Sequence, residues 1–325
     1  MRDFKCIGKS LMAISSAISL LVMTLLVSLG GSSAYAEQSL RFSSANPGGA
    51  WYILAVGVTE IIKKENPDFV FSIEPGGGYG SPIMVGEKKV NMGFAIAGSA
   101  SDAIEGREPF KKKFSNIRSM GSLYIHYIQG AVLKDSGIKD FGDMEKKKLT
   151  SGPKGQISWF WVNKFLELYG IEADVRSLDF GASAEAVVDG HVDMFFIGVP
   201  MPYGPMSNLA MQRPMRLVTF KEEILDKFCK EIGGFKKYNL PKENIPYKGT
   251  EEGLITVGTP LIIITNDEES EDLIYKCVKA IAENISELEN VSAAMKGFKP
   301  EDLAKDAGVP LHPGAMKYFK EVGWR

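Results

Sequence analysis

Short apolar runs alternate with amphipathic stretches from Leu40 to the C-terminal region of the chain. Leu54, Val58 and Ile62 recur at helical spacing, whereas residues 69–73 and 92–97 have the length and apolar content of buried strands. Such alternation is typical of a parallel sheet whose strands are joined by helices. The pattern therefore predicts an α/β fold.

Three of the predicted strands run into segments of glycine and small polar residues. The first strand ends at Phe42, and the three segments are residues 43–50, 74–81 and 98–102. Loops at the carboxyl ends of parallel strands share one edge of the sheet, where open α/β sheets bind ligands. Pro47 and the glycines after it predict a tight strand-to-helix turn that a ligand can approach closely. A turn that serves only chain reversal is the alternative.

A second unit begins near residue 149 and repeats the plan of the first. Its predicted elements are a strand, a glycine loop, a helix, a strand, a helix and a strand, at residues 149–151, 152–158, 159–169, 173–178, 182–188 and 192–197. Residues 261–264 predict a strand that returns to the first unit, and residues 270–284 an amphipathic helix. Residues 228–252, rich in Lys, Gly, Pro and Tyr, predict a surface excursion with little regular structure.

These units predict two lobes joined by hinge strands. The first lobe is expected to comprise residues 37–127 and 262–325, and the second lobe residues 128–261. Glycine-rich loops of both lobes would then border an interlobe cleft, a preferred place for small-ligand sites. Helix N-termini at the cleft can hold a carboxylate through their backbone N–H groups. Closure of the hinge on the ligand would then change the arrangement of the two lobes.

The N-terminal segment has the order of a secretory signal peptide. Basic residues precede an apolar run at residues 11–29, and Ala34-Tyr35-Ala36 follows it. This order predicts cleavage between Ala36 and Glu37, so that residues 1–36 are removed. The alternative is an uncleaved anchor, because the apolar run is nearly long enough to span a membrane.

Composition narrows the function further. The formal charge of the chain is −2, and Lys and Arg form no stripe interleaved with aromatic residues, so nothing indicates a nucleic-acid partner. Cys229 and Cys277 remain after removal of the signal peptide. They can pair in an oxidising compartment, but two cysteines do not make a disulfide scaffold.

Enzyme and cofactor motifs are incomplete. The segments at residues 98–101 and 181–185 lack the second glycine of a nucleophile elbow, and residues 152–156 lack the ending of a phosphate-binding loop. His126, His191 and His312 show no ligand spacing, so no metal site is expected. The sequence therefore predicts a binding protein without a cofactor, not an enzyme.

Several motifs in order resemble the TAXI family of solute receptors, the extracytoplasmic binding components of TRAP transporters. They lie at residues 46–52, 75–78, 135–139, 189–193, 198–202 and 310–319. The resemblance implies a type II periplasmic-binding-protein fold and a monomeric periplasmic receptor that delivers solute to an ion-gradient-driven TRAP permease. Family ligands include glutamate, glutamine, dicarboxylates and 2-oxoacids. The loops at residues 96–99 and 154–158 depart from the family pattern, which leaves the ligand open.

The candidate ligand-binding residues come from these loops and from the hinge. They are Asn46, Gly49, Ala50, Trp51, Tyr52, Gly77, Gly78, Tyr79, Gly98, Ser99, Tyr124, Lys154, Gln156, Ser158, Gly198 and Pro200. Tyr52 is favoured over Trp51 as the aromatic wall. Lys154 is a candidate point charge for a carboxylate, with an ordinary surface lysine as the alternative. His126 is expected to be only a hinge or surface histidine.

Two other functions stay open. One is an ABC-type receptor for another small solute, because lobed receptors share their architecture. The other is a secreted hydrolase or transferase built on the same lobes, which turnover of a candidate solute would reveal.

Overall fold

The computed structural model describes residues 37–47 and 49–325, and Ser39–Arg325 form one compact unit. The predicted signal peptide, residues 1–36, lies outside the described residues, as does Gly48 of the first glycine turn. Among the described residues no helix has both the length and the apolar character needed to cross a membrane.

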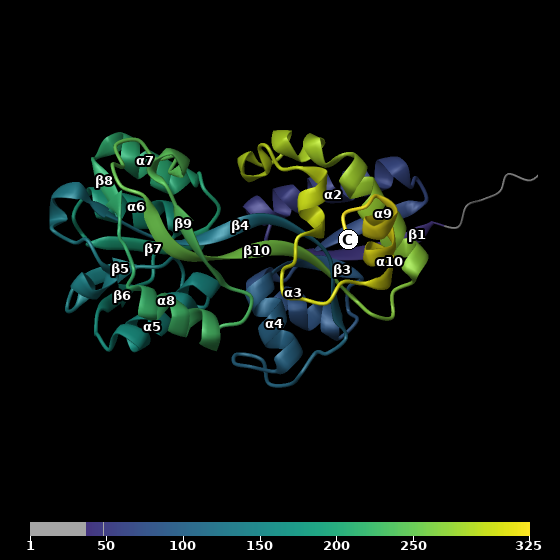
Figure 1. The fold of residues 1–325 in the computed structure, drawn as a ribbon, viewed down its shortest axis with the longest axis horizontal. Coiled ribbons are helices and arrows are strands. Elements are labelled where there is room, and N and C mark those ends of the chain that lie inside the picture. Colours follow the sequence, from purple (N-terminus) through teal and green to yellow (C-terminus); the bar gives the residue numbers. More distant parts are fainter. Residues whose placement is uncertain (1–36, 48) are drawn as a thin grey trace, which may run out of the picture. The chain divides into compact units, whose positions relative to one another are not determined.

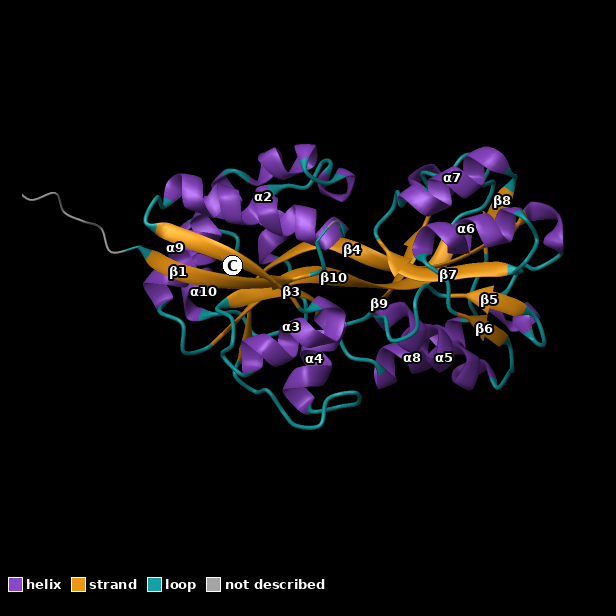
Figure 2. Ribbon diagram, turned by 180° about the vertical axis from the view of Figure 1, so that it is seen from behind, coloured by secondary structure: helices purple, strands orange, loops and turns teal. Residues whose placement is uncertain are grey.

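One mixed sheet of ten strands runs through the described chain, in the order β2-β1-β3-β10-β4-β7-β5-β6, with β8 paired to β4 and β9 to β10. Helices cover both faces of this sheet (Figures 1 and 2). The strands are β1 (Gln38–Ser44), β2 (Phe69–Pro75), β3 (Met92–Ile96), β4 (Ile117–Leu133), β5 (Lys148–Thr150), β6 (Asp174–Arg176), β7 (Met194–Val199), β8 (Met215–Leu217), β9 (Lys236–Leu240) and β10 (Leu254–Asn266).

Two long antiparallel strands, β4 and β10, carry the sheet from one lobe to the other. β10 pairs with β9 at its beginning and with β3 near its end, while β4 pairs with β10 up to Tyr127 and with β7 from Tyr127 onward. The first lobe is therefore built on β1 to β3, and the second lobe on β5 to β9. This arrangement confirms the predicted fold class, a type II periplasmic-binding-protein fold of two α/β lobes joined by crossing strands.

The described residues form nine α-helices, five in the first lobe and four in the second. Those of the first lobe are α2 (Ala50–Glu65), α3 (Gly77–Gly86), α4 (Ala97–Glu105), α9 (Glu271–Glu283) and α10 (Pro313–Glu321). Those of the second lobe are α5 (Ile157–Tyr169), α6 (Phe180–Val188), α7 (Gly204–Gln212) and α8 (Glu222–Glu231).

The predicted lobe boundaries fall inside the two crossing strands. The boundary at residues 127/128 lies where β4 begins to pair with β7, and the one at residues 261/262 lies where β10 begins to pair with β3. Because each crossing strand changes its hydrogen-bonded neighbour at this position, it can twist there while the backbone hydrogen bonds within each lobe persist. We therefore propose that the hinge between the lobes lies at these two positions.

Each lobe has an apolar core on both faces of the sheet. In the first lobe, one core lies under α2, α9 and α10, and the other under α3 and α4. In the second lobe, one core lies under α5 and α8, and the other under α6 and α7. The Trp51 side chain packs against a core of each lobe, so this residue links the two hydrophobic clusters.

Two segments differ from the prediction. Residues 98–102, expected as a loop, lie in α4, because the chain turns directly from β3 into a helix. Residues 228–252, expected as an irregular surface excursion, include the end of α8 and the strand β9. The apolar side chains of Phe228, Phe235 and Tyr247 are buried there, which gives this segment a place in the second lobe's core.

Replacement of Phe228 by Ala tests this core assignment. Phe228 is fully buried and stacks on Phe165 with 4.4 Å between ring centroids, so its truncation should lower the free energy of unfolding by about 3–5 kcal/mol. Urea unfolding followed by circular dichroism measures the loss, and Met211→Ala, at a side chain 68% exposed, is the control. Equal small losses in both variants would contradict the assignment.

Candidate functional site

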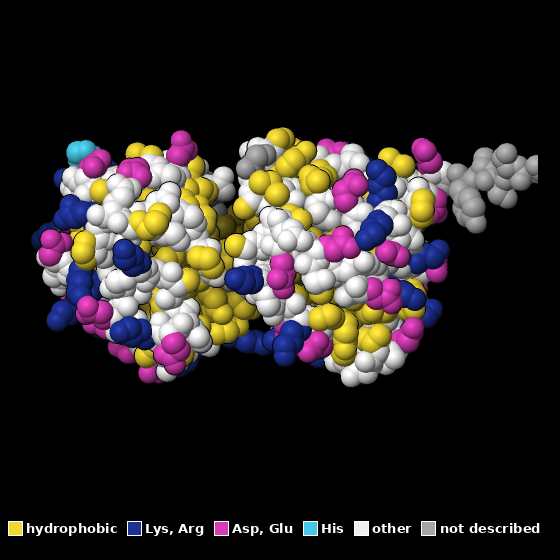
Figure 3. Space-filling view, turned by 90° about the horizontal axis from the view of Figure 1, so that it is seen from above, with side chains coloured by type: hydrophobic (Ala, Val, Ile, Leu, Met, Phe, Trp, Pro, Cys, Tyr) yellow, Lys and Arg dark blue, Asp and Glu magenta, His cyan; other side chains and the backbone are white. Residues whose placement is uncertain are grey.

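A cavity of about 540 Å³ lies between the two lobes. Figure 3 shows the hollow between them, with hydrophobic side chains in its depth. The first lobe contributes residues 45–47, Gly49 and residues 75–80, and the second lobe contributes residues 155–157 and Phe180. Both lobes therefore present strand-to-helix connections to the same space.

Four α-helices begin at this cavity. Gly49 and Gly76 are the N-caps of α2 and α3 in the first lobe, Gln156 is the N-cap of α5, and Phe180 is the first residue of α6. The first N–H groups of a helix have no partner within the helix, and they carry partial positive charge. None of the described lining residues is charged, so an anion in the cavity would be held by backbone N–H groups.

Six of the candidate residues line the cavity, namely Asn46, Gly49, Gly77, Gly78, Tyr79 and Gln156. The sequence reasoning missed Ala45, Pro47, Pro75, Gly76, Gly80, Gly155, Ile157 and Phe180. Most of these flank the predicted residues in the same loops. Phe180 was harder to find, because the sequence shows only that it lies between a predicted strand and a predicted helix.

The other candidates lie outside this lining, and they are Ala50, Trp51, Tyr52, Gly98, Ser99, Tyr124, Lys154, Ser158, Gly198 and Pro200. Lys154 is exposed, and its backbone N–H donates to Ser177 Oγ at 2.9 Å. Ser99 is buried, and its hydroxyl donates to the carbonyl of Ile96. The structure thus separates the candidates into cavity-lining residues and residues around them.

The lobes touch beside the cavity. A Cβ on Gly78 of α3 would lie 3.2 Å from Ile157 Cδ1 of α5, and the rings of Tyr79 and Phe160 meet edge to face with 6.1 Å between centroids. Farther along, a Cβ on Gly234 of the second lobe would lie 2.5 Å from the backbone nitrogen of Gly98 in α4. The structure therefore has its lobes in contact around the cavity.

A buried polar cluster lies close to the starts of α2 and α5. The His126 ring is stacked on Tyr124 and perpendicular to Trp51, at centroid distances of 5.4 and 5.8 Å. His126 Nδ1 lies 3.1 Å from the carbonyl oxygen of Gly198, and the Gly198 N–H donates to Ser158 Oγ. Trp51 and Ser158 are each the second residue of a helix that begins at the cavity.

His126 is buried, not the surface residue that the sequence allowed, with 4% of its surface exposed. Burial lowers its pKa to about 4, because water is not there to solvate the charged ring, and the bond to the Gly198 carbonyl offsets this only in part. Burial also raises the pKa of Tyr124, although a hydrogen bond with Trp51 acts in the opposite direction. Both side chains are therefore neutral at pH 7.

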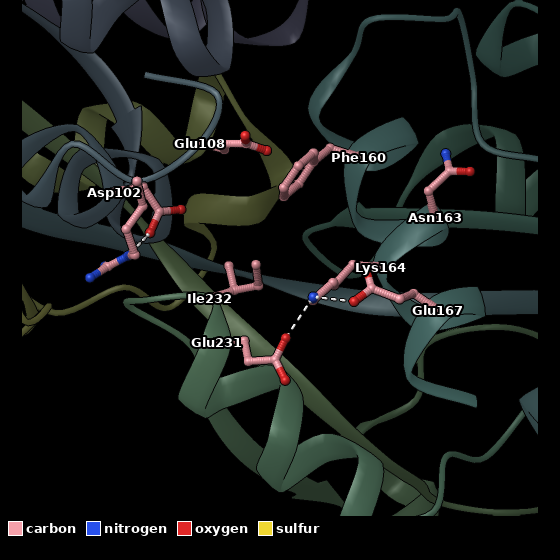
Figure 4. A pocket seen from close by; sticks show the side chains of 9 residues that line it. Asp102, Glu108, Phe160, Asn163, Lys164, Glu167, Glu231 and Ile232 are labelled. Carbon is pink, nitrogen blue, oxygen red and sulfur yellow. Dashed lines mark hydrogen bonds and ion pairs between the residues drawn. The ribbon is translucent and has the colours of Figure 1, made fainter. Parts of the chain in front are cut away.

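A second cavity, of about 450 Å³, lies between α4 of the first lobe and α5 and α8 of the second. Figure 4 shows Lys164 between Glu167 and Glu231, and the Nζ-to-oxygen distances are 2.9 and 2.6 Å. Asp102 pairs with Arg107 at 2.7 Å. Most charges around this cavity thus already have partners in the protein, so it is the weaker candidate for a ligand site.

No group of three or more possible ligands for a metal ion occurs in the described part of the chain. Cys229 and Cys277 are both free in the structure, the first half-buried and the second buried. Burial raises the pKa of the Cys229 thiol to about 11 and that of Cys277 to about 12. Neither thiol is therefore prepared to act as a nucleophile at neutral pH.

The pH dependence of stability tests the burial of neutral His126. An unfolded histidine titrates near 6.5 and His126 titrates near 4, so the unfolded state binds more protons between these values. Stability should be lost as the pH falls from 6.5 to 4, by about 3 kcal/mol from this residue. His126→Gln should lack this contribution in urea unfolding, whereas exposed His191→Gln should retain it. Superimposable profiles of wild type and His126→Gln would contradict the assignment.

Two solved structures of low sequence identity resemble this chain over most of its length. A structure described as a periplasmic transporter has a TM-score of 0.48 and 15% identity, covering 89% of this chain and 94% of that chain. The probable amino-acid ABC transporter extracellular-binding protein ytmK of Bacillus subtilis has a TM-score of 0.47 and 13% identity, covering 80% of this chain and 98% of that chain. These scores are too low to carry functional conclusions.

The whole described chain except its ends matches one protein-family model. The matched residues are 42–323, which include both lobes, the crossing strands and every residue that lines the interlobe cavity. The chain belongs to the NMT1-like family.

Proposed function

We propose that this protein is an extracytoplasmic solute receptor whose two lobes close over a small organic anion. The cavity between the lobes is the main support for this proposal, because four helices begin at it and no described lining residue is charged. A carboxylate is the group that such an arrangement favours. Acidic amino acids, dicarboxylates and 2-oxoacids are the candidate solutes.

Binding is favoured over catalysis by the side chains around the cavity. The described lining residues include no Ser, Cys, His, Lys, Asp or Glu, so the usual nucleophiles and general bases are not represented among them. Their polar side chains are Asn46, Tyr79 and Gln156, which can orient a ligand by hydrogen bonds. A receptor needs this kind of lining, whereas a hydrolase needs an activated nucleophile or water.

Delivery of the solute to a TRAP-type permease is the proposed role in transport. The motifs at residues 46–52, 198–202 and 310–319, which resemble the TAXI family, support this partner. The signal-peptide pattern of residues 1–36 supports export of the receptor to the periplasm. An ABC-type permease is the alternative partner, and reconstitution with each class of permease would distinguish the two.

Calorimetric titration of the purified receptor with glutamate, glutamine, succinate and 2-oxoglutarate tests the proposed function. At least one anion should bind with micromolar affinity and without turnover. Gln156→Ala should weaken this binding about threefold to tenfold, because it removes a hydrogen-bonding side chain from the lining. Lys154→Ala should leave it unchanged, since Lys154 lies outside the lining. Formation of product from any of these solutes would contradict the receptor assignment.

Lobe closure can be tested at Gly78. A valine there would press on Ile157 of the other lobe, so Gly78→Val should weaken solute binding about tenfold or more by hindering closure. Gly204→Val is the matched control, because a Cβ at Gly204 of α7 meets nothing within 4 Å and α7 does not border the cavity. Calorimetry gives the affinities. If both variants bind as wild type does, the lobes do not need this contact for binding.

A further inference from the structure

The buried His126 ring has one nitrogen that no group of the protein uses. Nδ1 lies 3.1 Å from the Gly198 carbonyl, while Nε2 is buried and has no hydrogen-bond partner among the described residues. A buried polar atom without a partner costs free energy, so its persistence calls for an explanation. The proposed binding of a carboxylate by helix N-termini does not use this atom.

The hydrogen bond at Nδ1 determines what Nε2 can do. A carbonyl oxygen has no proton to give, so Nδ1 must carry the proton and donate it to Gly198. In the neutral ring the other nitrogen then holds a lone pair. Because burial keeps the pKa of His126 near 4, the ring stays neutral at pH 7 and Nε2 remains an acceptor only.

The position of His126 connects this acceptor to the interlobe cavity. Its ring contacts Trp51, two residues after the cavity-lining Gly49, and it is bonded to Gly198, which is bonded in turn to Ser158 next to the cavity-lining Ile157. His126 also precedes Tyr127, where β4 passes from one lobe to the other. His126 Nε2 has almost no accessible surface in this structure, so a solute can reach it only when the lobes open at the proposed hinge.

We propose that His126 Nε2 accepts a hydrogen bond from the bound solute, so that the receptor selects anions that also carry an N–H or O–H donor. This inference rests on the proposed function and narrows it. The helix N-termini bind the carboxylate, and His126 Nε2 accepts a hydrogen bond from an ammonium or hydroxyl group on the same solute. A solute with only acceptors at that position, such as a 2-oxoacid, leaves Nε2 unpaired.

Matched sets of solutes test this selection. Alanine, lactate and pyruvate differ only in the group on the second carbon, as do aspartate, malate and oxaloacetate, and glutamate, 2-hydroxyglutarate and 2-oxoglutarate. Within the set whose length fits, calorimetry should find the amino or hydroxy acid bound about tenfold or more tightly than the oxo acid. Equal affinity across the set would overturn the inference and leave the proposed function standing.

Two variants of His126 separate recognition from a structural role. His126→Asn keeps a side-chain donor for the Gly198 carbonyl but has no atom at the position of Nε2, so it should reduce the preference for donor-bearing solutes to about onefold. His126→Gln can place an amide oxygen near that position and should restore part of the preference. His312→Asn is the control, because both nitrogens of buried His312 already have partners in the protein.

The ring nitrogen itself provides a second readout. In ¹⁵N spectra of histidine-labelled receptor, the Nε2 signal of His126 should move on binding of the amino or hydroxy acid and stay in place with the oxo acid. Equal loss of affinity for every solute in His126→Asn would show that the residue has only a structural role and would overturn the inference. Absence of binding by every solute would instead contradict the proposed function, and this inference with it.

Discussion

The antiparallel pairing of β4 with β10 is the constraint on which the rest of this structure depends. These two strands are part of both lobes, so each lobe's sheet is completed by residues that also belong to the connection. Their backbone hydrogen bonds keep the lobes in register, and within the described residues the chain passes between the lobes only in these two strands. A cavity between the lobes can then open and close without unfolding either core.

The candidate site is formed by the connections that follow the carboxyl ends of strands in both lobes. Helices α2 and α3 of the first lobe and α5 and α6 of the second begin at one cavity, so their unpaired N–H groups can act on one ligand. Charged side chains are not needed for this attraction. Specificity then falls to the few polar groups nearby, and we propose that these include the Nε2 of His126, which is buried and has no hydrogen-bond partner among the described residues.

Local patterns in the sequence predicted most elements because they depend on neighbouring residues. The helical spacing of Leu54, Val58 and Ile62 predicts α2, and the helix predicted at residues 159–169 ends at Tyr169, as α5 does. Prediction failed where packing between distant segments decides the outcome. Phe228, Phe235 and Tyr247 looked like parts of a surface excursion because nothing in their own stretch shows that the second lobe's core receives them.

The sequence by itself determined the alternation of strands and helices, the glycine-rich connections and the two-lobed α/β fold class. These follow from the periodicity of apolar residues and from the turn chemistry of glycine and proline, which act over a few residues. Only the tertiary structure decided that Lys154 lies outside the cavity lining, that Phe180 lies within it, and that His126 is buried with a free nitrogen. Those outcomes depend on how two lobes and two crossing strands meet, and no single stretch of sequence contains that geometry.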